Sequence, residues 1–212
     1  MGLPELSDRE VEILDAYLRC ASKSGVESVT LQKVAAEAKI AFSTVRYYFA
    51  GKPYTLAEFA AFSIVKEIQA FTQEFIAKKK ARDGHDGIKT HIRASFEWIA
   101  ANPIKSKHLL YFYYLNAYKP KFPMRANTLF NVARDRFESL IHEGIGRGIY
   151  PKADDPRELA TQVHTLLIGG LTLAMMEPSI KVWKKCLESV LEGASMLICP
   201  RGELPSGPKR SE

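Results

Sequence analysis

The amino-acid sequence predicts an all-α fold, and three observations support that class. Apolar residues recur at the i, i+3, i+4, i+7 spacing of one helix face in several separate segments. Helix-start signals precede some of these segments: Ser7 stands three residues before Glu10, and Asp155 is followed by Pro156 and Glu158. No segment of any length alternates apolar and polar residues as a half-buried strand does. We therefore expect helices packed against helices.

The first helix is expected to begin after Ser7 and to end near Ser22. Ser7 and Glu10 have the spacing of a capping box, in which each side chain accepts a hydrogen bond from the backbone N–H of the other residue. An apolar stripe follows at helical spacing and should face the core. Its members are Val11, Leu14, Leu18 and Ala21.

Residues 30–52 read as two short helices joined by a tight turn. Thr30 can cap the first helix by accepting a hydrogen bond from one of its free backbone N–H groups. The turn falls at residues 39–41, where Ile40 supplies an apolar plug, and residues 42–48 supply the second helix. The inward residues are expected to be Leu31, Val34, Ala35, Ala38, Val45 and Phe49. This arrangement is that of a helix-turn-helix DNA-binding motif.

The outer face of the second short helix carries side chains that can reach base edges and phosphates. Lys52 is expected at the start of the next helix, where its ammonium group and the free N–H groups favour a phosphate oxygen. Thr30 can also touch a phosphate, although capping alone is an alternative role. The alternative for the whole motif is a three-helix module that contacts protein and not DNA. The predicted DNA contacts are Thr30, Ser43, Thr44, Arg46, Tyr47, Tyr48 and Lys52.

The distribution of charge favours a phosphate-rich partner. The chain has a formal net charge of +6 and a pI near 9.1, which alone is also common among soluble proteins. Between residues 28 and 54, however, four basic residues stand against one acid, Glu37, so this small segment carries a net charge of +3. A concentrated positive charge is the electrostatic feature that DNA binding requires.

In roughly its first 55 residues the chain resembles the TetR family of bacterial transcriptional regulators. The family usually has Ser or Thr where Ala41 stands, Gly where Ser43 stands and Tyr where Arg46 stands, so the match is incomplete at the second helix. The resemblance rests on an ordered set of residue types: Ile13, Leu14, Ala16, Gly25, Thr30, Val34, Ala35, Ala38, Ile40, Thr44, Phe49 and Lys52.

The resemblance implies a division of the chain. Residues 1–54 would form an amino-terminal three-helix, helix-turn-helix DNA-binding domain, and residues 55–199 a helical effector-binding and dimerisation domain. Residues 200–212 are expected to be a disordered tail, because they are rich in Pro, Gly and charged residues. The spacing of apolar residues and breakers predicts further helices at about 53–79, 88–101, 109–118, 124–145, 156–176 and 180–194.

The resemblance also implies that the last two helices pair with those of a second subunit to form a four-helix bundle. Gly170 would allow close approach of the helix backbones, and large apolar side chains would supply the contact. The alternative is that these residues only close a core within one chain. The residues concerned are Leu167, Gly170, Leu171, Trp183, Leu187 and Leu191.

Aromatic residues are concentrated in the middle of the chain, and they predict the wall of a pocket for a small, mostly apolar effector. The alternative is that they fill the core. Tyr114 and His164 would supply polar groups that orient the ligand. The predicted effector-binding residues are Trp98, Tyr111, Tyr114, Phe130, Phe137 and His164.

The sequence argues against catalysis, metals and cofactors. The five histidines show no His-Glu-x-x-His spacing, and the three cysteines, Cys20, Cys186 and Cys199, are too scattered for a zinc site or a disulfide framework. Glycines at 144, 146 and 148 follow a helix and are better explained as a loop than as a phosphate cradle. We expect no enzyme activity, no cofactor and no metal.

The sequence thus predicts a cytoplasmic, homodimeric transcriptional regulator that does not span a membrane. It would bind double-stranded DNA at a near-palindromic operator, and we expect a repressor that a small, mostly apolar effector releases. The alternative function is a helical protein-interaction module that does not bind DNA.

Overall fold

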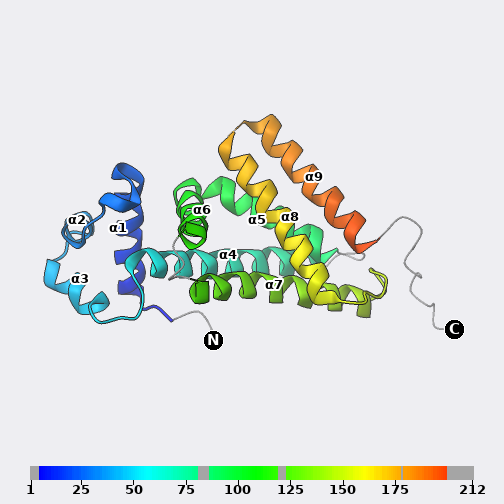
Figure 1. The fold of residues 1–212 in the computed structure, drawn as a ribbon, viewed down its shortest axis with the longest axis horizontal. Helices are drawn as coiled ribbons and strands as arrows, with labels where there is room; N and C mark the ends of the chain where they lie inside the picture. The colour runs from blue at the N-terminus through cyan, green and yellow to red at the C-terminus, as the bar shows by residue number, and fades with distance from the viewer. Residues whose placement is uncertain (1–4, 81–85, 119–122, 178, 200–212) are drawn as a thin grey trace. The chain divides into compact units, whose positions relative to one another are not determined.

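The computed structural model describes residues 5–80, 86–118, 123–177 and 179–199, and every regular element in these ranges is helical (Figure 1). The all-α prediction is confirmed. The predicted disordered tail, residues 200–212, lies outside the described residues. The helices are α1 (Asp8–Ser24), a short 3-10 helix η1 (Val26–Ser28), α2 (Leu31–Glu37), α3 (Phe42–Phe49), α4 (Leu56–Lys80), α5 (Gly87–Ala101), α6 (Pro103–Tyr118), α7 (Pro123–Gly146), α8 (Pro156–Met176) and α9 (Ile180–Ile198).

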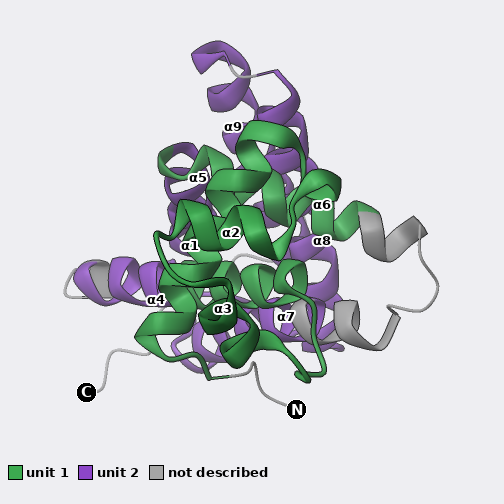
Figure 2. Ribbon diagram, turned by 90° about the vertical axis from the view of Figure 1, so that its left-hand side faces the viewer, with its two compact units in different colours: residues 1–69, 101–129 green, residues 70–100, 130–212 purple. Residues whose placement is uncertain are grey.

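The chain forms two compact units (Figure 2). Unit 1 contains residues 1–69 and 101–129, and unit 2 contains residues 70–100 and 130–212. Unit 1 therefore holds the predicted DNA-binding segment together with the first part of α4 and with α6. The functional division at residue 54 stays a prediction.

Helix α1 begins with the predicted capping box. The Glu10 carboxylate accepts a hydrogen bond from the Ser7 backbone N–H at 2.8 Å, and the Ser7 hydroxyl accepts one from the Glu10 N–H at 3.4 Å. The helix continues two residues beyond the expected end and stops at Gly25, whose φ of 79° suits glycine. Contacts with both α2 and α6 bury a wider face than the single stripe predicted. The buried apolar residues of α1 are Ile13, Leu14, Ala16, Tyr17, Leu18 and Cys20, whereas Val11 and Ala21 are only half-buried.

The helix-turn-helix prediction is confirmed as a fold element. Thr30 caps α2 by accepting a hydrogen bond from the Lys33 N–H at 3.3 Å. The turn uses Lys39 in the left-handed region, with φ of 56°, and the Ile40 N–H donates to the Ala35 carbonyl at 3.0 Å. The buried residues of α2 and α3 are Val34, Ala35, Val45 and Phe49. The outer face of α3 is therefore held in place by a small apolar core beneath it.

Helix α6 begins six residues earlier than expected. Asn102 separates α5 from α6, and α6 begins directly at Pro103, because proline is well tolerated in the first turn of a helix. The Asn102 carbonyl accepts the Ser106 N–H at 3.0 Å, which closes that first turn. The earlier start brings His108 into unit 1, where its ring packs edge-on against Tyr17 with centroids 5.4 Å apart.

Unit 2 is built around the packing of α8 against α9. Helix α8 has the predicted bounds, and its Asp155 cap accepts hydrogen bonds from the N–H groups of Arg157 and Glu158 at 3.0 Å each. Gly170 permits the contact between these helices, because a β-carbon at this position would lie 2.2 Å from a methyl group of Val190. The buried residues of the pair include Val163, Leu167, Leu171, Ala174, Val190, Ala194 and Ile198.

Among the described helices, α8 alone has the length and composition of a membrane span, with a mean hydropathy of 1.4. The core helix of a soluble protein has the same properties, and α8 supplies buried residues to its contact with α9. This one helix is weak evidence for a membrane location.

Candidate functional site

The outer face of α3 carries the residues predicted to contact DNA. Ser43, Arg46 and Tyr47 are exposed and lie at i, i+3 and i+4, so they share one face of the helix. Tyr47 is 82% exposed, which is unusual for so large an aromatic side chain. Thr44 and Tyr48 are half-buried at the edges of this face. We name Ser43, Arg46 and Tyr47 the α3 outer face.

Ring contacts hold the side chains of the α3 outer face. The Arg46 guanidinium lies over the Phe42 ring, 6.0 Å from its centroid. The Tyr47 and Tyr48 rings pack edge-on with centroids 5.2 Å apart. Phe42 was not among the predicted site residues, although its i, i+4 spacing to Arg46 was a visible signal. Such contacts reduce the freedom that a recognition side chain loses on binding.

The sequence predicts Lys52 at the start of a helix, and this prediction is wrong. Lys52 lies in the loop after α3, and α4 begins only at Leu56. A second capping box fixes that start: the Glu58 carboxylate accepts the Thr55 N–H at 2.7 Å, and the Thr55 hydroxyl accepts the Glu58 N–H at 3.3 Å. The Thr-x-x-Glu spacing was visible in the sequence and predicts this start.

The ammonium group of Lys52 is engaged within the chain. It pairs with the Glu10 carboxylate and lies 5.5 Å and 5.3 Å from the ring centroids of Phe49 and Phe59. Burial would raise the pKa of Glu10, but the hydrogen bonds from Lys52 and Ser7 outweigh it and hold that pKa below its usual value. A phosphate contact by Lys52 must therefore compete with Glu10.

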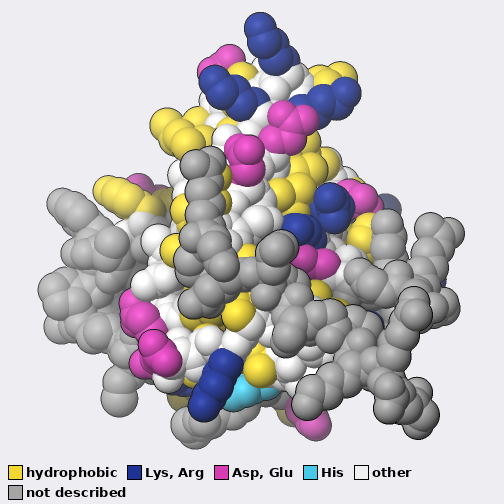
Figure 3. All heavy atoms as spheres, turned by 90° about the vertical axis from the view of Figure 1, so that its right-hand side faces the viewer, with side chains coloured by type: hydrophobic (Ala, Val, Ile, Leu, Met, Phe, Trp, Pro, Cys, Tyr) yellow, Lys and Arg dark blue, Asp and Glu magenta, His cyan; other side chains and the backbone are white. Residues whose placement is uncertain are grey.

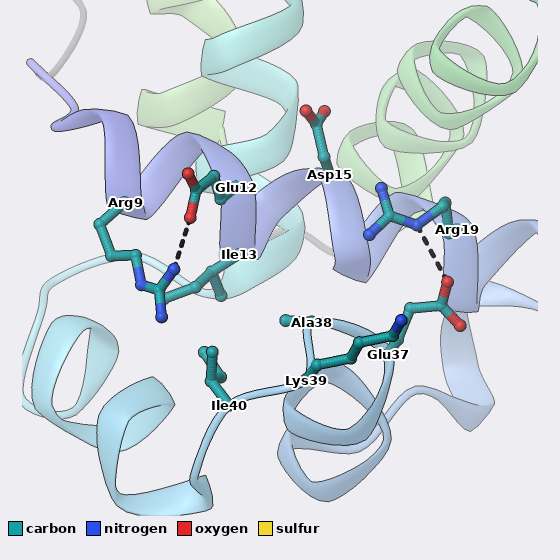
Figure 4. A pocket seen from close by; sticks show the side chains of 9 residues that line it. All are labelled: Arg9, Glu12, Ile13, Asp15, Arg19, Glu37, Ala38, Lys39 and Ile40. Carbon is teal, nitrogen blue, oxygen red and sulfur yellow. Dashed lines mark hydrogen bonds and ion pairs between the residues drawn. The ribbon is translucent and has the colours of Figure 1, made fainter.

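A polar hollow of about 350 Å³ lies between α1 and the turn after α2 (Figure 4). Two ion pairs flank it, Arg9–Glu12 at 2.6 Å and Arg19–Glu37 at 2.9 Å. Lys23 also pairs with Glu37, at 2.7 Å, so the single acid of the basic segment is neutralised by α1. The hollow has charged walls and does not resemble a site for a mostly apolar effector. Its lining residues are Arg9, Glu12, Ile13, Asp15, Arg19, Glu37, Ala38, Lys39 and Ile40.

The six predicted effector residues are divided between the two units. Tyr111 and Tyr114 belong to unit 1, where their ring centroids lie 6.3 Å apart and the Tyr111 hydroxyl donates to Glu27 at 3.4 Å. The other four belong to unit 2, and three of these are in contact. The His164 ring lies 5.9 Å from Phe130 and 6.1 Å from Phe137, centroid to centroid.

Trp98, the fourth of these residues, is buried in unit 2, as are Phe137 and His164. Burial is compatible both with the wall of a pocket and with core filling, the alternative given above. The effector-binding role of the six residues therefore stays a prediction.

Three polar residues beside this aromatic group were not predicted from the sequence. His91 of α5 packs edge-on against Phe137 with ring centroids 4.8 Å apart, and Arg134 and Arg136 lie on α7. Within the described part of the chain, buried nitrogens of all three have no hydrogen-bond partner: Nδ1 of His91 and Nε of each arginine. No sequence signal points to them, because Arg134 and Arg136 stand beside Asp135 and Glu138 in a charged stretch.

Electrostatic effects link the same residues. Burial lowers the pKa of His91 to about 3, and the positive charge of Arg136 and the neighbouring His164 act in the same direction. Burial, followed by the charge of Arg134, lowers the pKa of His164 to about 4. Both rings are therefore neutral at neutral pH, and each contributes one N–H donor and one acceptor nitrogen.

The residues predicted for the subunit interface occupy two different environments. Leu167 and Leu171 are buried within unit 2, which agrees with the alternative that they close a core within one chain. Trp183 is half-buried and packs edge-on against Phe96, 5.3 Å between ring centroids. Leu187 and Leu191 of α9 are half-buried. Gly170 serves the packing of α8 against α9 in the same chain.

Other apolar side chains of α8 and α9 are exposed. Leu173, Met176 and Ile180 are 59%, 72% and 77% exposed, and Met196 is 55% exposed. The space-filling view shows hydrophobic side chains at the surface among charged ones (Figure 3). We name these four residues the exposed α8–α9 residues. They were not predicted, because helical spacing does not show which of two apolar faces the partner helix covers.

Among the described residues, no group of three or more His, Cys, Asp or Glu side chains is placed to hold a metal ion.

Among known proteins, the chain is similar to several solved structures. No protein-family model and no curated protein sequence matches the chain. A TetR transcription regulator from Haloarcula marismortui is 22% identical, with 90% of this chain and 98% of that chain covered and a TM-score of 0.74. FadR of Bacillus subtilis in complex with stearoyl-CoA is 17% identical, with 89% and 97% covered and a TM-score of 0.67.

SmeT in complex with triclosan is a third structural match. It is 21% identical, with 97% of this chain and 100% of that chain covered and a TM-score of 0.68. SmeT is described as the repressor of the multidrug efflux pump SmeDEF of Stenotrophomonas maltophilia. These matches extend over nearly the whole length of both chains, so the likeness includes the carboxyl-terminal helices as well as the helix-turn-helix. The chain therefore has the fold of the TetR-family transcriptional regulators.

Proposed function

We propose that this protein is a DNA-binding regulator of transcription, and that it represses until an effector releases it. The observation that carries the proposal is the α3 outer face. Its exposed hydroxyl, guanidinium and phenol groups are those that read base edges and phosphates, and α3 is the second helix of a helix-turn-helix. The net positive charge of residues 28–54 adds attraction for the phosphate backbone.

The exposed α8–α9 residues support a homodimer. Four large apolar side chains at 55–77% exposure are costly in water and suit a contact with a second copy of the chain. Leu187 and Leu191, which are half-buried on α9, would join that contact. A twofold dimer would place two α3 helices about 34 to 36 Å apart, which fits successive major grooves of a near-palindromic operator.

Release by an effector follows from the difference between two dimer geometries. A ligand that binds the unit 2 aromatic group better in the geometry that does not fit DNA would shift the dimer toward it. The solved complex of SmeT with triclosan supports a small, largely apolar ligand for this chain also, and that of FadR with stearoyl-CoA supports a ligand with a long apolar chain. A regulator of this kind acts in the cytoplasm and needs no catalytic activity.

The direct test is binding of the purified full-length chain to DNA upstream of its own gene. We expect retardation in a gel, a footprint with twofold symmetry, and loss of the complex as salt rises. The triple variant Ser43→Ala, Arg46→Ala, Tyr47→Ala should abolish specific retardation. The matched control is Gln32→Ala, an exposed polar residue of α2. Equal binding by the triple variant and the wild type would remove α3 from the interface and with it the basis of the proposal.

A further inference from the structure

Two histidine rings contact Phe137 in unit 2, and each has an arginine of α7 as an electrostatic neighbour. His91 comes from α5, Arg134 and Arg136 from α7, and His164 from α8. We name these four residues the unit 2 nitrogen cluster.

The cluster lacks a carboxylate among the described residues. The nearest acids along α7, Asp135 and Glu138, pair with Arg157 at 3.0 Å and 2.5 Å. Glu97 of α5 is exposed, and Glu158 of α8 accepts a hydrogen bond from Gln162 at 3.3 Å. Glu143 of α7 pairs with Arg147 at 3.6 Å. Among the described residues of these three helices, no carboxylate forms an ion pair with the half-buried Arg134 or Arg136.

Three buried nitrogens of the cluster lack hydrogen-bond partners. Nδ1 of His91 and the Nε atoms of Arg134 and Arg136 are buried without a hydrogen bond in the described part of the chain. His91 as a whole is only 7% exposed. A buried donor without an acceptor is unfavourable, and native proteins rarely keep several together unless a ligand or an ordered water supplies the acceptor.

We propose that Arg136 and His91 of the unit 2 nitrogen cluster bind the carboxylate of an organic acid whose apolar body lies against Phe130, Phe137 and Trp98. A guanidinium group presents two parallel N–H donors that match the two oxygens of a carboxylate. The neutral histidine rings add donors without adding charge.

This inference rests on the proposed function in one respect: the organic acid would be the effector that releases the DNA. Binding itself is tested without DNA. The probes are dodecanoate and 1-dodecanol, which share an apolar chain and differ in charge, each used below its micelle-forming or solubility limit. The readouts are the thermal shift of the full chain and quenching of its two tryptophans, Trp98 and Trp183.

We expect dodecanoate to raise the melting temperature and quench fluorescence, and 1-dodecanol to bind at least tenfold more weakly. Arg136→Met should weaken dodecanoate binding by about 10- to 100-fold, because a charge-assisted hydrogen bond is lost. The matched control is Arg93→Met, an exposed arginine on α5, which should bind as the wild type does.

A second readout separates ligand binding from a structural role. Without ligand, Arg136→Met should melt at the same or a higher temperature than the wild type, because it removes a buried N–H that lacks an acceptor. A lower melting temperature together with equal loss of dodecanoate and dodecanol binding would overturn the proposal. Tighter binding of dodecyl phosphate than of dodecanoate would also overturn it.

A gel shift with operator DNA distinguishes failure of this inference from failure of the proposed function. Binding of dodecanoate through Arg136 without any DNA retardation would support the carboxylate site and refute the regulator. Retardation of DNA by a protein to which dodecanoate does not bind, or binds no better than dodecanol, would overturn the site and leave the regulator standing. If the protein both binds dodecanoate through Arg136 and retards the operator DNA, dodecanoate should release the DNA from the wild type but not from Arg136→Met.

Discussion

The ammonium group of Lys52 forms an ion pair with the carboxylate of Glu10, which lies 42 residues earlier in the chain. The pair ties the first turn of α1 to the loop between α3 and α4, and Glu10 is buried at 6% exposure. The same carboxylate also accepts a hydrogen bond from the Ser7 N–H. Lys52 therefore has a structural role in addition to the phosphate contact predicted from the sequence.

Lys52→Met should lower the free energy of unfolding by about 1 to 2 kcal/mol, because it leaves the Glu10 carboxylate buried without its cation. Urea unfolding at pH 7 measures this. Lys39→Met, at an exposed lysine of the same segment, is the control and should change little. If Lys52 also binds phosphate, the slope of log affinity against log salt should fall by about one unit. An unchanged free energy of unfolding would contradict the structural role of Lys52. An unchanged slope of log affinity against log salt would contradict its phosphate contact.

The two buried histidines of unit 2 predict loss of stability in mild acid. Burial lowers the pKa of His91 to about 3 and that of His164 to about 4, from an ordinary value of 6.5. Between pH 6.5 and about 4 the unfolded chain therefore holds more protons than the folded chain, and the free energy of unfolding decreases as the pH falls. Each histidine contributes a slope of up to about 1.4 kcal/mol per pH unit.

Urea unfolding at pH 7.5, 6.5 and 5.5 tests this dependence. His91→Leu and His164→Leu should each flatten the decrease below pH 6.5, and the double variant should flatten it further. His142→Gln is the matched control, because His142 is an exposed histidine of α7. A decrease of the same size in the double variant would place the acid-sensitive groups elsewhere.

Much of the fold could be predicted from the sequence because its signals are local. The capping box at Ser7 and the Asp155–Pro156 start depend on residues within one helical turn, and α8 has the predicted bounds. The outer face of α3 was likewise predictable, since Val45 and Phe49 alternate with Ser43 and Arg46 at helical spacing.

The features that were missed depend on residues far apart in the chain. The pairing of Lys52 with Glu10 and the packing of His91 against Phe137 each join separate helices or loops, and no local spacing encodes them. The interface prediction had the same difficulty. Leu171 and Leu173 are equally apolar in sequence, but α9 covers one face of α8 only, so Leu171 is buried and Leu173 is exposed.

Arg46→Ala should cost about 1 to 3 kcal/mol of binding free energy on the operator and relax the preference at one base pair, if the guanidinium reads a guanine edge. Titrations with the operator and with random DNA of equal length measure both quantities. Phe42→Leu should give a smaller loss, because it removes only the ring beneath the guanidinium, 6.0 Å away. Equal losses on the two DNAs would make Arg46 a backbone contact.

Charges placed at exposed and at buried leucine or isoleucine positions of α8 and α9 should have different consequences. Leu173→Glu combined with Ile180→Glu should give a folded monomer, because both side chains are exposed in one chain and would be buried only in a dimer. Leu171→Glu should instead unfold unit 2, since Leu171 is buried within the chain. Light scattering and circular dichroism separate these results. A dimeric, folded Leu173→Glu, Ile180→Glu variant would show that the subunits meet elsewhere.

The adjacent glycines of α8 provide a matched pair for the packing of α8 against α9. A β-carbon at Gly170 would lie 2.2 Å from a Val190 methyl group, whereas one at Gly169 would meet nothing within 4 Å. Gly170→Ala should therefore lower the free energy of unfolding by about 1 to 3 kcal/mol through overpacking. Gly169→Ala should raise it by about 0.5 to 1 kcal/mol, because alanine favours the helix.

The same overpacking should be relieved by making room on α9. Adding Val190→Ala to Gly170→Ala removes the methyl group that the new β-carbon would meet, and the next nearest atom, on Phe96, is 3.6 Å away and in ordinary contact. The double variant should therefore be more stable than the sum of the two single changes predicts, a coupling that urea unfolding measures directly. Additive losses would mean that α8 and α9 can separate slightly at Gly170, so that this glycine is not required for their contact.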